Sequence, residues 1–303
     1  MNREAVLLLG GGGFIGVALA RRLAAAGRRV HVVSRRAAVP AIADVSFHRG
    51  ALDDAALLRA LLPACGTVVH LASETTPGRS AHHPLWEADT IRATLALLEI
   101  LQAVDAHLIF LSSGGALYGN AAHFPVTEAA PLAPLSYHGA GKAAVEAFLH
   151  AFRAQGRRVT VLRPANAYGP EQPLRAGFGF IRTLLEQMRT GTALDIWGDG
   201  EAVRDFIYVD DVATACALFV DRPQDRGIYN VGSGEECSIN AVARLAGEVC
   251  GQAPKLRYRP ARQGDVRQVA LDISHIRAVT GWAPQVGLAE GIRRTWAWLQ
   301  GES

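Results

Sequence analysis

The chain has 303 residues, half of them hydrophobic and 19% charged, which is enough apolar material to bury a large core. The net charge of +3 comes from scattered arginines without a basic block, so we expect no binding to nucleic acid. The four cysteines form no C-x-x-C pair, so the sequence predicts neither a disulfide framework nor a metal site. An apolar stretch over residues 5–20 is interrupted by glycines, which is typical of a buried strand and turn. We expect a cytoplasmic protein that does not span a membrane.

The first half of the chain alternates short β-branched or leucine-rich runs with longer amphipathic stretches. This alternation predicts an α/β fold in which helices cover both faces of a Rossmann-like, doubly wound parallel sheet. The expected strands are residues 5–9, 29–33, 45–48, 67–71, 107–111 and 159–162. The expected helices between them are residues 14–26, 53–62, 85–104 and 139–154.

The second half is richer in loops that contain glycine, proline and arginine. Helices are expected at residues 178–190, 212–220, 239–250 and 288–300. We therefore predict a larger domain over residues 1–170 and a smaller C-terminal lobe over residues 171–303, interleaved with the first.

A glycine-rich turn follows the first expected strand. Read as G-x-x-G-x-x-G, its glycines are Gly10, Gly13 and Gly16, and a helix begins at Phe14 and Ile15. Glycines let the chain turn sharply and bring backbone N–H groups at a helix N-terminus against a pyrophosphate. The sequence therefore predicts that residues 1–170 bind a dinucleotide.

The end of the second expected strand carries Ser34, Arg35 and Arg36. An acid at this place accepts hydrogen bonds from the ribose hydroxyls of NAD, whereas arginine can pair with the 2'-phosphate of NADP. We therefore predict NADP(H) in preference to NAD(H). The alternative is that both arginines are ordinary solvated surface residues.

Several motifs recur along the chain in a fixed order. They lie at residues 71–73, 112–113, 118–119, 142, 163–170, 204–212, 229–234, 262–267 and 281–284. Over nearly its whole length the chain thus resembles the NAD-dependent epimerase/dehydratase family of extended short-chain dehydrogenases/reductases. The resemblance implies a nucleotide-diphosphate sugar as substrate and a homodimer formed through the helices at 85–104 and 139–154. Together with the glycine turn it assigns to the cofactor Gly10, Gly13, Phe14, Ile15, Gly16, Ser34, Arg35, Arg36, Leu52, Leu71, Ala72, Ser73, Lys142 and Pro164.

The family carries a Tyr-x-x-x-Lys pair, whose spacing places both side chains on one helix face. Counting back four residues from Lys142 gives His138, and Tyr137 lies one place earlier. The resemblance therefore makes His138 the acid/base candidate and Lys142 its partner, which also holds the nicotinamide ribose. Tyr137 could serve only if the helix began later. The alternative is that His138 merely fills the place of the tyrosine in an altered or inactive site.

A second departure concerns the hydroxyl that hydrogen-bonds the reacting oxygen in the family, four residues before the tyrosine of its Tyr-Gly pair. Four residues before Tyr118 stands Gly114. Ser113 is the candidate to replace the missing hydroxyl, although a shift of one residue on an extended chain reverses the side-chain direction.

The resemblance also assigns substrate contacts. Arg204, Arg262 and Arg267 match positions that face the nucleotide diphosphate, Asn166 matches another contact to the same part of the ligand, and Asp265 accepts from a ribose hydroxyl. Guanidinium groups provide charge-assisted donors for phosphates. Neither the base nor the sugar can be identified from these residues.

Three functions are consistent with the sequence. The first two transfer hydride at the fourth carbon of the sugar, as an NADP(H)-dependent 4-keto reductase or as a 4-epimerase. The third is a catalytically impaired NADP(H)-binding sensor or scaffold. A 4,6-dehydratase is disfavoured because Gly114 and Gly115 stand where an acidic pair would be needed for water elimination.

Overall fold

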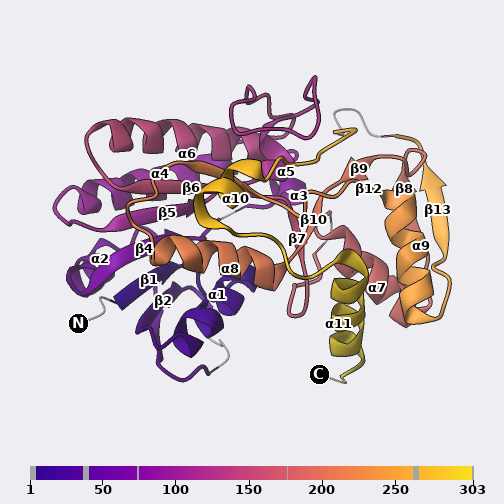
Figure 1. The fold of residues 1–303 in the computed structure, drawn as a ribbon, viewed down its shortest axis with the longest axis horizontal. Helices are drawn as coiled ribbons and strands as arrows, with labels where there is room; N and C mark the ends of the chain where they lie inside the picture. The colour runs from indigo at the N-terminus through magenta and orange to yellow at the C-terminus, as the bar shows by residue number, and fades with distance from the viewer. Residues whose placement is uncertain (1–4, 37–40, 74, 176, 262–265, 302–303) are drawn as a thin grey trace.

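A seven-stranded parallel sheet forms the centre of the protein (Figure 1). The computed structural model describes residues 5–36, 41–73, 75–175, 177–261 and 266–301. The sheet contains β1 (Ala5–Leu9), β2 (Val30–Ser34), β3 (Val45–Arg49), β4 (Cys65–His70), β5 (His107–Leu111), β6 (Val159–Pro164) and β11 (Ile228–Val231). Their order is β11-β6-β5-β4-β1-β2-β3, and every neighbouring pair is parallel. The strand order reverses beside β1, which creates a crevice at the carboxyl ends of the strands.

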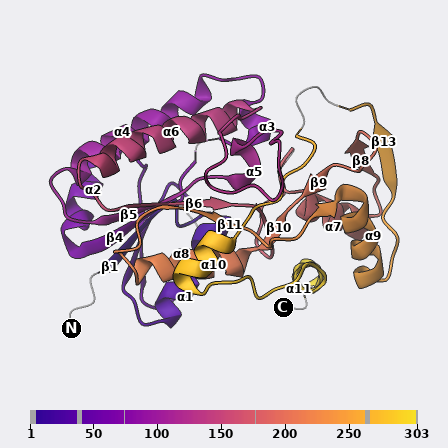
Figure 2. The same ribbon diagram turned by 45° about the horizontal axis from the view of Figure 1, so that its top comes forward.

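Helices cover both faces of this sheet. One face is covered by α2 (Ala55–Leu61), α4 (Trp86–Leu101) and α6 (Tyr137–Ala154), and the other by α1 (Phe14–Ala25), α8 (Val209–Val220) and α10 (Ser274–Thr280). Figure 2 shows α4 and α6 above the sheet and α1, α8 and α10 below it. Short helical turns at η1 (Leu62–Ala64), α3 (Pro77–Ser80) and α5 (Gly114–Leu117) connect the longer elements.

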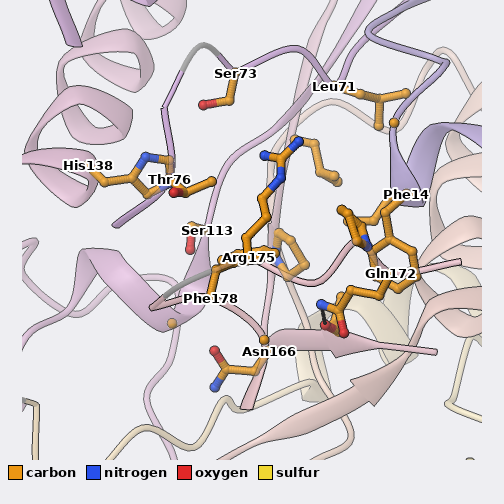
Figure 3. A pocket seen from close by; sticks show the side chains of 18 of the residues that line it. Phe14, Leu71, Ser73, Thr76, Ser113, His138, Asn166, Gln172, Arg175 and Phe178 are labelled. Atoms are coloured by element: carbon orange, nitrogen blue, oxygen red, sulfur yellow. Dashed lines mark hydrogen bonds between the residues drawn. The ribbon is translucent and has the colours of Figure 1, made fainter. Parts of the chain in front are cut away.

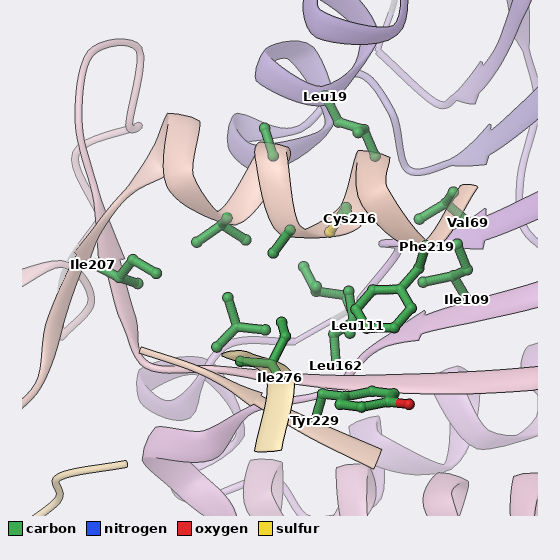
Figure 4. Close-up of a cluster of buried hydrophobic side chains, with 14 of the residues drawn as sticks. Leu19, Val69, Ile109, Leu111, Leu162, Ile207, Cys216, Phe219, Tyr229 and Ile276 are labelled. Carbon is green, nitrogen blue, oxygen red and sulfur yellow. The ribbon is translucent and has the colours of Figure 1, made fainter. Parts of the chain in front are cut away.

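The sheet separates two apolar cores, because successive side chains of a strand point to opposite faces. In β1, Leu8 packs toward α1 and α8, in the core that also contains Phe219 (Figure 4). Leu7 and Leu9 belong to the core under α4 and α6. All five residues of β1 are buried, as expected for a strand covered on both sides.

A smaller lobe lies beyond the carboxyl ends of the large sheet, on the right in Figure 1. Its strands are β7 (Asn166–Tyr168) with β10 (Phe206–Tyr208), β8 (Leu194–Trp197) with β13 (Leu256–Arg259), and β9 (Val203–Arg204) with β12 (Cys237–Ser238). Its helices are α7 (Phe180–Thr190), α9 (Ile239–Cys250) and α11 (Leu288–Gln300). A third apolar core lies between these elements.

The predicted fold class is confirmed, and six strands and eight helices were expected close to where they are. The seventh strand, β11, was missed because its four residues include Tyr229 and Asn230 and give no continuous apolar run. Helix α6 begins two residues earlier than predicted, since the hydroxyl of Ser136 accepts a hydrogen bond from the amide of Gly139 and caps the helix. Both β11 and α8 follow residue 170, yet β11 is a strand of the large sheet and α8 packs against one of its faces. The predicted domain boundary at residue 170 remains a prediction. No helix within the described ranges is long and apolar enough to cross a membrane.

Candidate functional site

A cavity of about 1020 Å³ lies at the carboxyl ends of the central strands, between the large sheet and the smaller lobe. Gly10 follows β1 into it, Leu71 follows β4, Ser112 follows β5 and Ala165 follows β6. Its volume is at the upper end of the range of about 300–1,000 Å³ for small-molecule sites. The cavity therefore has the position and the size expected of a ligand site in a doubly wound fold.

The glycine-rich turn forms one wall of this cavity. Gly10 has a φ of +81°, and a Cβ there would lie 2.7 Å from the backbone of Ala72. A Cβ on Gly16 would lie 2.5 Å from the Cα of Gly11, so only glycine permits this packing. Helix α1 begins after Gly13 without a side-chain cap, and the first N–H groups of a helix lack partners within the helix. These features fit a pyrophosphate group.

The residues assigned to the cofactor from the sequence all line this one cavity. They are Gly10, Gly13, Phe14, Ile15, Gly16, Ser34, Arg35, Arg36, Leu52, Leu71, Ala72, Ser73, Lys142 and Pro164. Arg36 crosses the glycine turn, where its guanidinium donates a hydrogen bond of 2.9 Å to the carbonyl of Gly12. Its backbone amide donates to the hydroxyl of Ser34, so the second strand and the glycine turn are joined at this end of the cavity.

Helix α6 brings His138 and Lys142 to the opposite side of the cavity. The ammonium of Lys142 donates to the carbonyl of Leu111 at 2.9 Å and lies 4.7 Å from the centre of the Phe110 ring. Burial lowers the pKa of Lys142 to about 8, although Glu87 and Glu146 partly oppose this shift. The ammonium is therefore easier to deprotonate than that of an exposed lysine.

Polar groups contact the Nδ1 atom of the His138 side chain. Its Nδ1 lies 3.2 Å from the hydroxyl of Thr75 and 3.7 Å from Oε1 of Glu87. Tyr137, in contrast, is 49% exposed and does not line the cavity. Because α6 already begins at Tyr137, one residue corresponds to a rotation of about 100° around the helix, which separates the two side chains.

Two serines at the end of β5, Ser112 and Ser113, both line the cavity. Ser112 is buried, and its hydroxyl has no hydrogen-bond partner among the described residues. Ser113 precedes α5 in an extended conformation and borders the cavity between His138 and Asn166 (Figure 3).

The residues assigned to the substrate divide into three groups. Asn166 lines the cavity, and its buried Nδ2 has no hydrogen-bond partner within the described part of the chain. Arg204 also lines it, and its guanidinium donates to the carbonyls of Val203 and Val266 at 2.8 and 2.7 Å. Arg267 is exposed and is not among the lining residues. Arg262 and Asp265 lie outside the described residues.

Some polar residues at the cavity or directly behind it were not predicted. Arg175 extends across the cavity in Figure 3, and Gln172 lines it with a buried Oε1 that has no hydrogen-bond partner among the described residues. Both lie in the loop before α7, where the sequence has no regular pattern. Thr75 and Glu87 lie behind His138, and a glutamate in the first turn of an amphipathic helix ordinarily indicates a surface position.

Comparison with known proteins agrees with this geometry. A model of the NAD dependent epimerase/dehydratase family matches residues 6–232. The chain is 32% identical over 309 residues to a UDP-glucose 4-epimerase of Mycolicibacterium smegmatis, covering 98% of this chain and 99% of the relative. It is also 32% identical over 353 residues to a dTDP-L-rhamnose 4-epimerase of Burkholderia thailandensis, covering 100% of this chain and 96% of the relative.

Solved structures match the fold over the same extent. The crystal structure of a UDP-glucose 4-epimerase from Thermotoga maritima with UDP-glucose gives a TM-score of 0.91 at 32% identity, covering 98% of this chain and 99% of the other. The UDP-glucose 4-epimerase of Thermus thermophilus in complex with NAD gives a TM-score of 0.90 at 32% identity, covering 99% and 100%. Since sequence motifs, family match and fold agree over most of the chain, the protein belongs to the NAD-dependent epimerase/dehydratase family.

Proposed function

We propose that the protein transfers hydride at the fourth carbon of a nucleotide-diphosphate sugar, as a 4-keto reductase or a 4-epimerase. The observation that carries this proposal is the single cavity that contains the glycine turn, His138 and Lys142 on one helix face, and Asn166 and Arg204 from the smaller lobe. Support also comes from relatives named as 4-epimerases of UDP-glucose and dTDP-L-rhamnose.

In this proposal each group of residues that lines the cavity has its own role. A bound nicotinamide dinucleotide supplies hydride exchange with the sugar carbon. The glycine turn and the first turn of α1 bind its pyrophosphate, and the ammonium of Lys142 binds ribose hydroxyls. His138 accepts the proton of the sugar hydroxyl in oxidation and returns it in reduction, since its imidazole borders the cavity and a ring nitrogen can both accept and donate a proton.

Within this proposal the cofactor is NADP(H) in preference to NAD(H). The support is that Ser34, Arg35 and Arg36 line the cavity at the end of β2 and include no acid to bind the ribose hydroxyls. Calorimetric titration should give a dissociation constant for NADPH at least ~10-fold below that for NADH. Arg35→Ser should remove most of this difference, whereas Arg59→Ser, on the exposed side of α2, should retain it. Tighter binding of NADH than of NADPH would contradict the cofactor preference.

Reductase and epimerase differ in what they consume. A reductase uses one NADPH for each 4-keto sugar reduced, whereas an epimerase interconverts sugars without net change of cofactor. The test incubates the protein with NADPH and, in a parallel series, with NADP⁺, each together with a panel of UDP-, dTDP- and GDP-linked sugars and 4-keto sugars. Nicotinamide absorbance and product are followed in both series. Loss of absorbance identifies a reductase, and interconversion without loss identifies an epimerase. Binding of ligands with neither change would refute the proposed activity and favour a sensor or scaffold.

We further infer that the protein forms a homodimer through α4 and α6. These helices pack side by side, and large apolar side chains remain exposed on or beside both of them. They include Leu85 just before α4, which is 79% exposed, Trp86 on α4, which is 39% exposed, and Phe148 on α6, which is 43% exposed. Exposed apolar residues on neighbouring helices are typical of a covered surface. Light scattering at micromolar concentration should give the mass of a dimer, and Phe148→Glu should give that of a monomer. A monomeric wild-type protein would contradict this inference.

A further inference from the structure

A carboxylate is buried directly behind the proposed acid/base residue. Glu87 lies in the first turn of α4 and is 6% exposed. It approaches α6 where that helix has Gly141, because a Cβ at position 141 would lie 2.7 Å from Oε2 of Glu87. Its Oε1 has no hydrogen-bond partner among the residues that the structure describes. A buried carboxylate with an incomplete set of partners is costly, which favours a role beyond packing.

Two side chains connect this carboxylate with the cavity. Glu87 Oε1 lies 3.7 Å from His138 Nδ1, and the hydroxyl of Thr75 lies 3.2 Å from the same nitrogen. Burial raises the pKa of Glu87, but interactions with the side chains of His138, Thr75 and Ser80 outweigh it, so that the net shift is downward. Glu87 is therefore an anion at neutral pH.

An anion at this place fixes the direction of the hydrogen bonds. An ionised carboxylate can only accept, so the single hydroxyl hydrogen of Thr75 is drawn toward Glu87. The Thr75 oxygen is then left to accept from His138, which requires a proton on Nδ1 of the imidazole. A neutral ring with its proton on Nδ1 has its lone pair on Nε2, and Nε2 makes no hydrogen bond with any described residue.

We propose that Glu87 is a positioning residue that acts through Thr75 to hold His138 in the Nδ1–H tautomer, with Nε2 free to exchange a proton with the substrate. This inference rests on the proposed function. In oxidation the O–H bond of the sugar hydroxyl breaks, an N–H bond forms at Nε2, and a carbonyl forms as the same carbon loses its hydrogen as hydride. A bound nicotinamide dinucleotide would accept that hydride. Glu87 also stabilises the imidazolium that results, as a carboxylate behind a catalytic histidine does in other enzymes.

Among the described residues, charged groups come close to the imidazole from α4 and from its own helix. Glu87 approaches it from α4, and Lys142 lies one turn further along α6. Thr75 carries no charge. Replacing Glu87 by glutamine removes the only anion of the pair and leaves the cation, so the protonated ring loses its main electrostatic support.

The deciding experiment is ¹⁵N NMR of the histidine side chains at a pH where the ring is neutral, with His138→Gln used to assign the His138 signals. The wild-type protein should show the shifts of the Nδ1–H tautomer. Glu87→Gln should show a mixture of tautomers, because an amide can both donate to Thr75 and accept from it. Glu99→Gln, which changes an exposed carboxylate at the far end of the same helix, should match the wild type.

Enzyme kinetics of the same variants provide a second test. Glu87→Gln should lower kcat by ~10–100-fold and leave the dissociation constant of the cofactor within ~2-fold, since only the proton-transfer geometry changes. Thr75→Val should resemble it, and Thr75→Ser, which keeps the hydroxyl, should recover most of the activity. An Nε2–H tautomer in the wild type, or an unchanged tautomer in Glu87→Gln, would overturn the proposal. Expected tautomers without turnover of any nucleotide sugar would refute the proposed function and leave the role of Glu87 in orienting His138 intact.

Discussion

Leu271 fills the space that a side chain at position 114 would need. A Cβ on Gly114 would lie 2.5 Å from Cδ1 of Leu271 and 3.0 Å from the carbonyl oxygen of Arg163. Leu271 is completely buried in the core beneath the sheet, so its side chain has little room to move. The absence of a hydroxyl at position 114 is therefore built into the packing of this protein, and any hydroxyl near the reacting oxygen must come from a neighbour such as Ser113.

This packing predicts that Gly114→Ser will destabilise the protein rather than restore the missing hydroxyl. The expected loss in free energy of unfolding is about 1–3 kcal/mol, which is typical of an overpacked core. Chemical denaturation measures it. In the double variant Gly114→Ser/Leu271→Ala the two losses should be less than additive, because the smaller side chain makes room for the larger one. Strictly additive losses would contradict the contact.

The buried ion pair between Arg163 and Glu146 should be essential for stability. The guanidinium donates to both carboxylate oxygens, with the shortest distance at 2.6 Å, and both side chains are at most 5% exposed. Glu146→Ala leaves a buried cation without its partner and should cost about 3–5 kcal/mol of unfolding free energy. The matched control is Asp105→Ala, which breaks an exposed pair with Arg158 and should cost below about 1 kcal/mol. Equal losses in the two variants would show that burial does not matter here.

The buried side chain of His107 should make the folded protein less stable in acid. Burial lowers its pKa from 6.5 to about 4, with Arg158 and Arg226 contributing in the same direction. Between these two values the unfolded chain binds a proton that the folded protein does not, so stability falls as the pH falls. At about pH 5 the loss from this residue is about 2 kcal/mol relative to neutral pH. His107→Gln can still donate a hydrogen bond to Thr160 and should reduce the pH dependence by this amount. An unchanged dependence would mean that His107 is protonated in the folded state.

The buried ammonium of Lys142 should make the affinity for the cofactor fall at alkaline pH. Since burial lowers its pKa to about 8, the ammonium loses its proton as the pH rises through this value. The neutral amine is a weaker donor to the ribose, so the dissociation constant should rise by ~10-fold between about pH 7 and about pH 9. Lys142→Met should bind more weakly throughout and show no such dependence. A flat profile for the wild-type protein, measured by calorimetry, would exclude a titrating lysine at the cofactor.

Local patterns in the sequence pointed to residues of the glycine turn and of α6 that line one cavity in the structure. The glycines of the turn and the spacing between His138 and Lys142 lie within short continuous segments, where periodicity determines which side chains share a face. Thr75, Glu87 and Arg175 could not be found in this way, because Thr75 and Arg175 reach the cavity from separate loops and Glu87 packs behind His138 from another helix. Their roles depend on contacts across the chain, such as the approach of Glu87 to Gly141, that no local pattern encodes.

The exposure of Tyr137 also depends on one local detail. The cap formed by Ser136 fixes the start of α6 and therefore which of two neighbouring residues faces the cavity. Helix ends are the least predictable part of an element from sequence, and here the start of the helix decides whether His138 or Tyr137 lines the cavity.

The central claim is that His138 transfers the proton while hydride leaves or reaches the sugar. It is tested most directly by single-turnover absorbance of the nicotinamide after rapid mixing of cofactor-loaded protein with its nucleotide sugar. His138→Ala should bind both ligands with affinities within ~3-fold of the wild type and slow the change in nicotinamide absorbance by at least ~100-fold. A His138→Ala protein that exchanges hydride at the wild-type rate would contradict the claim.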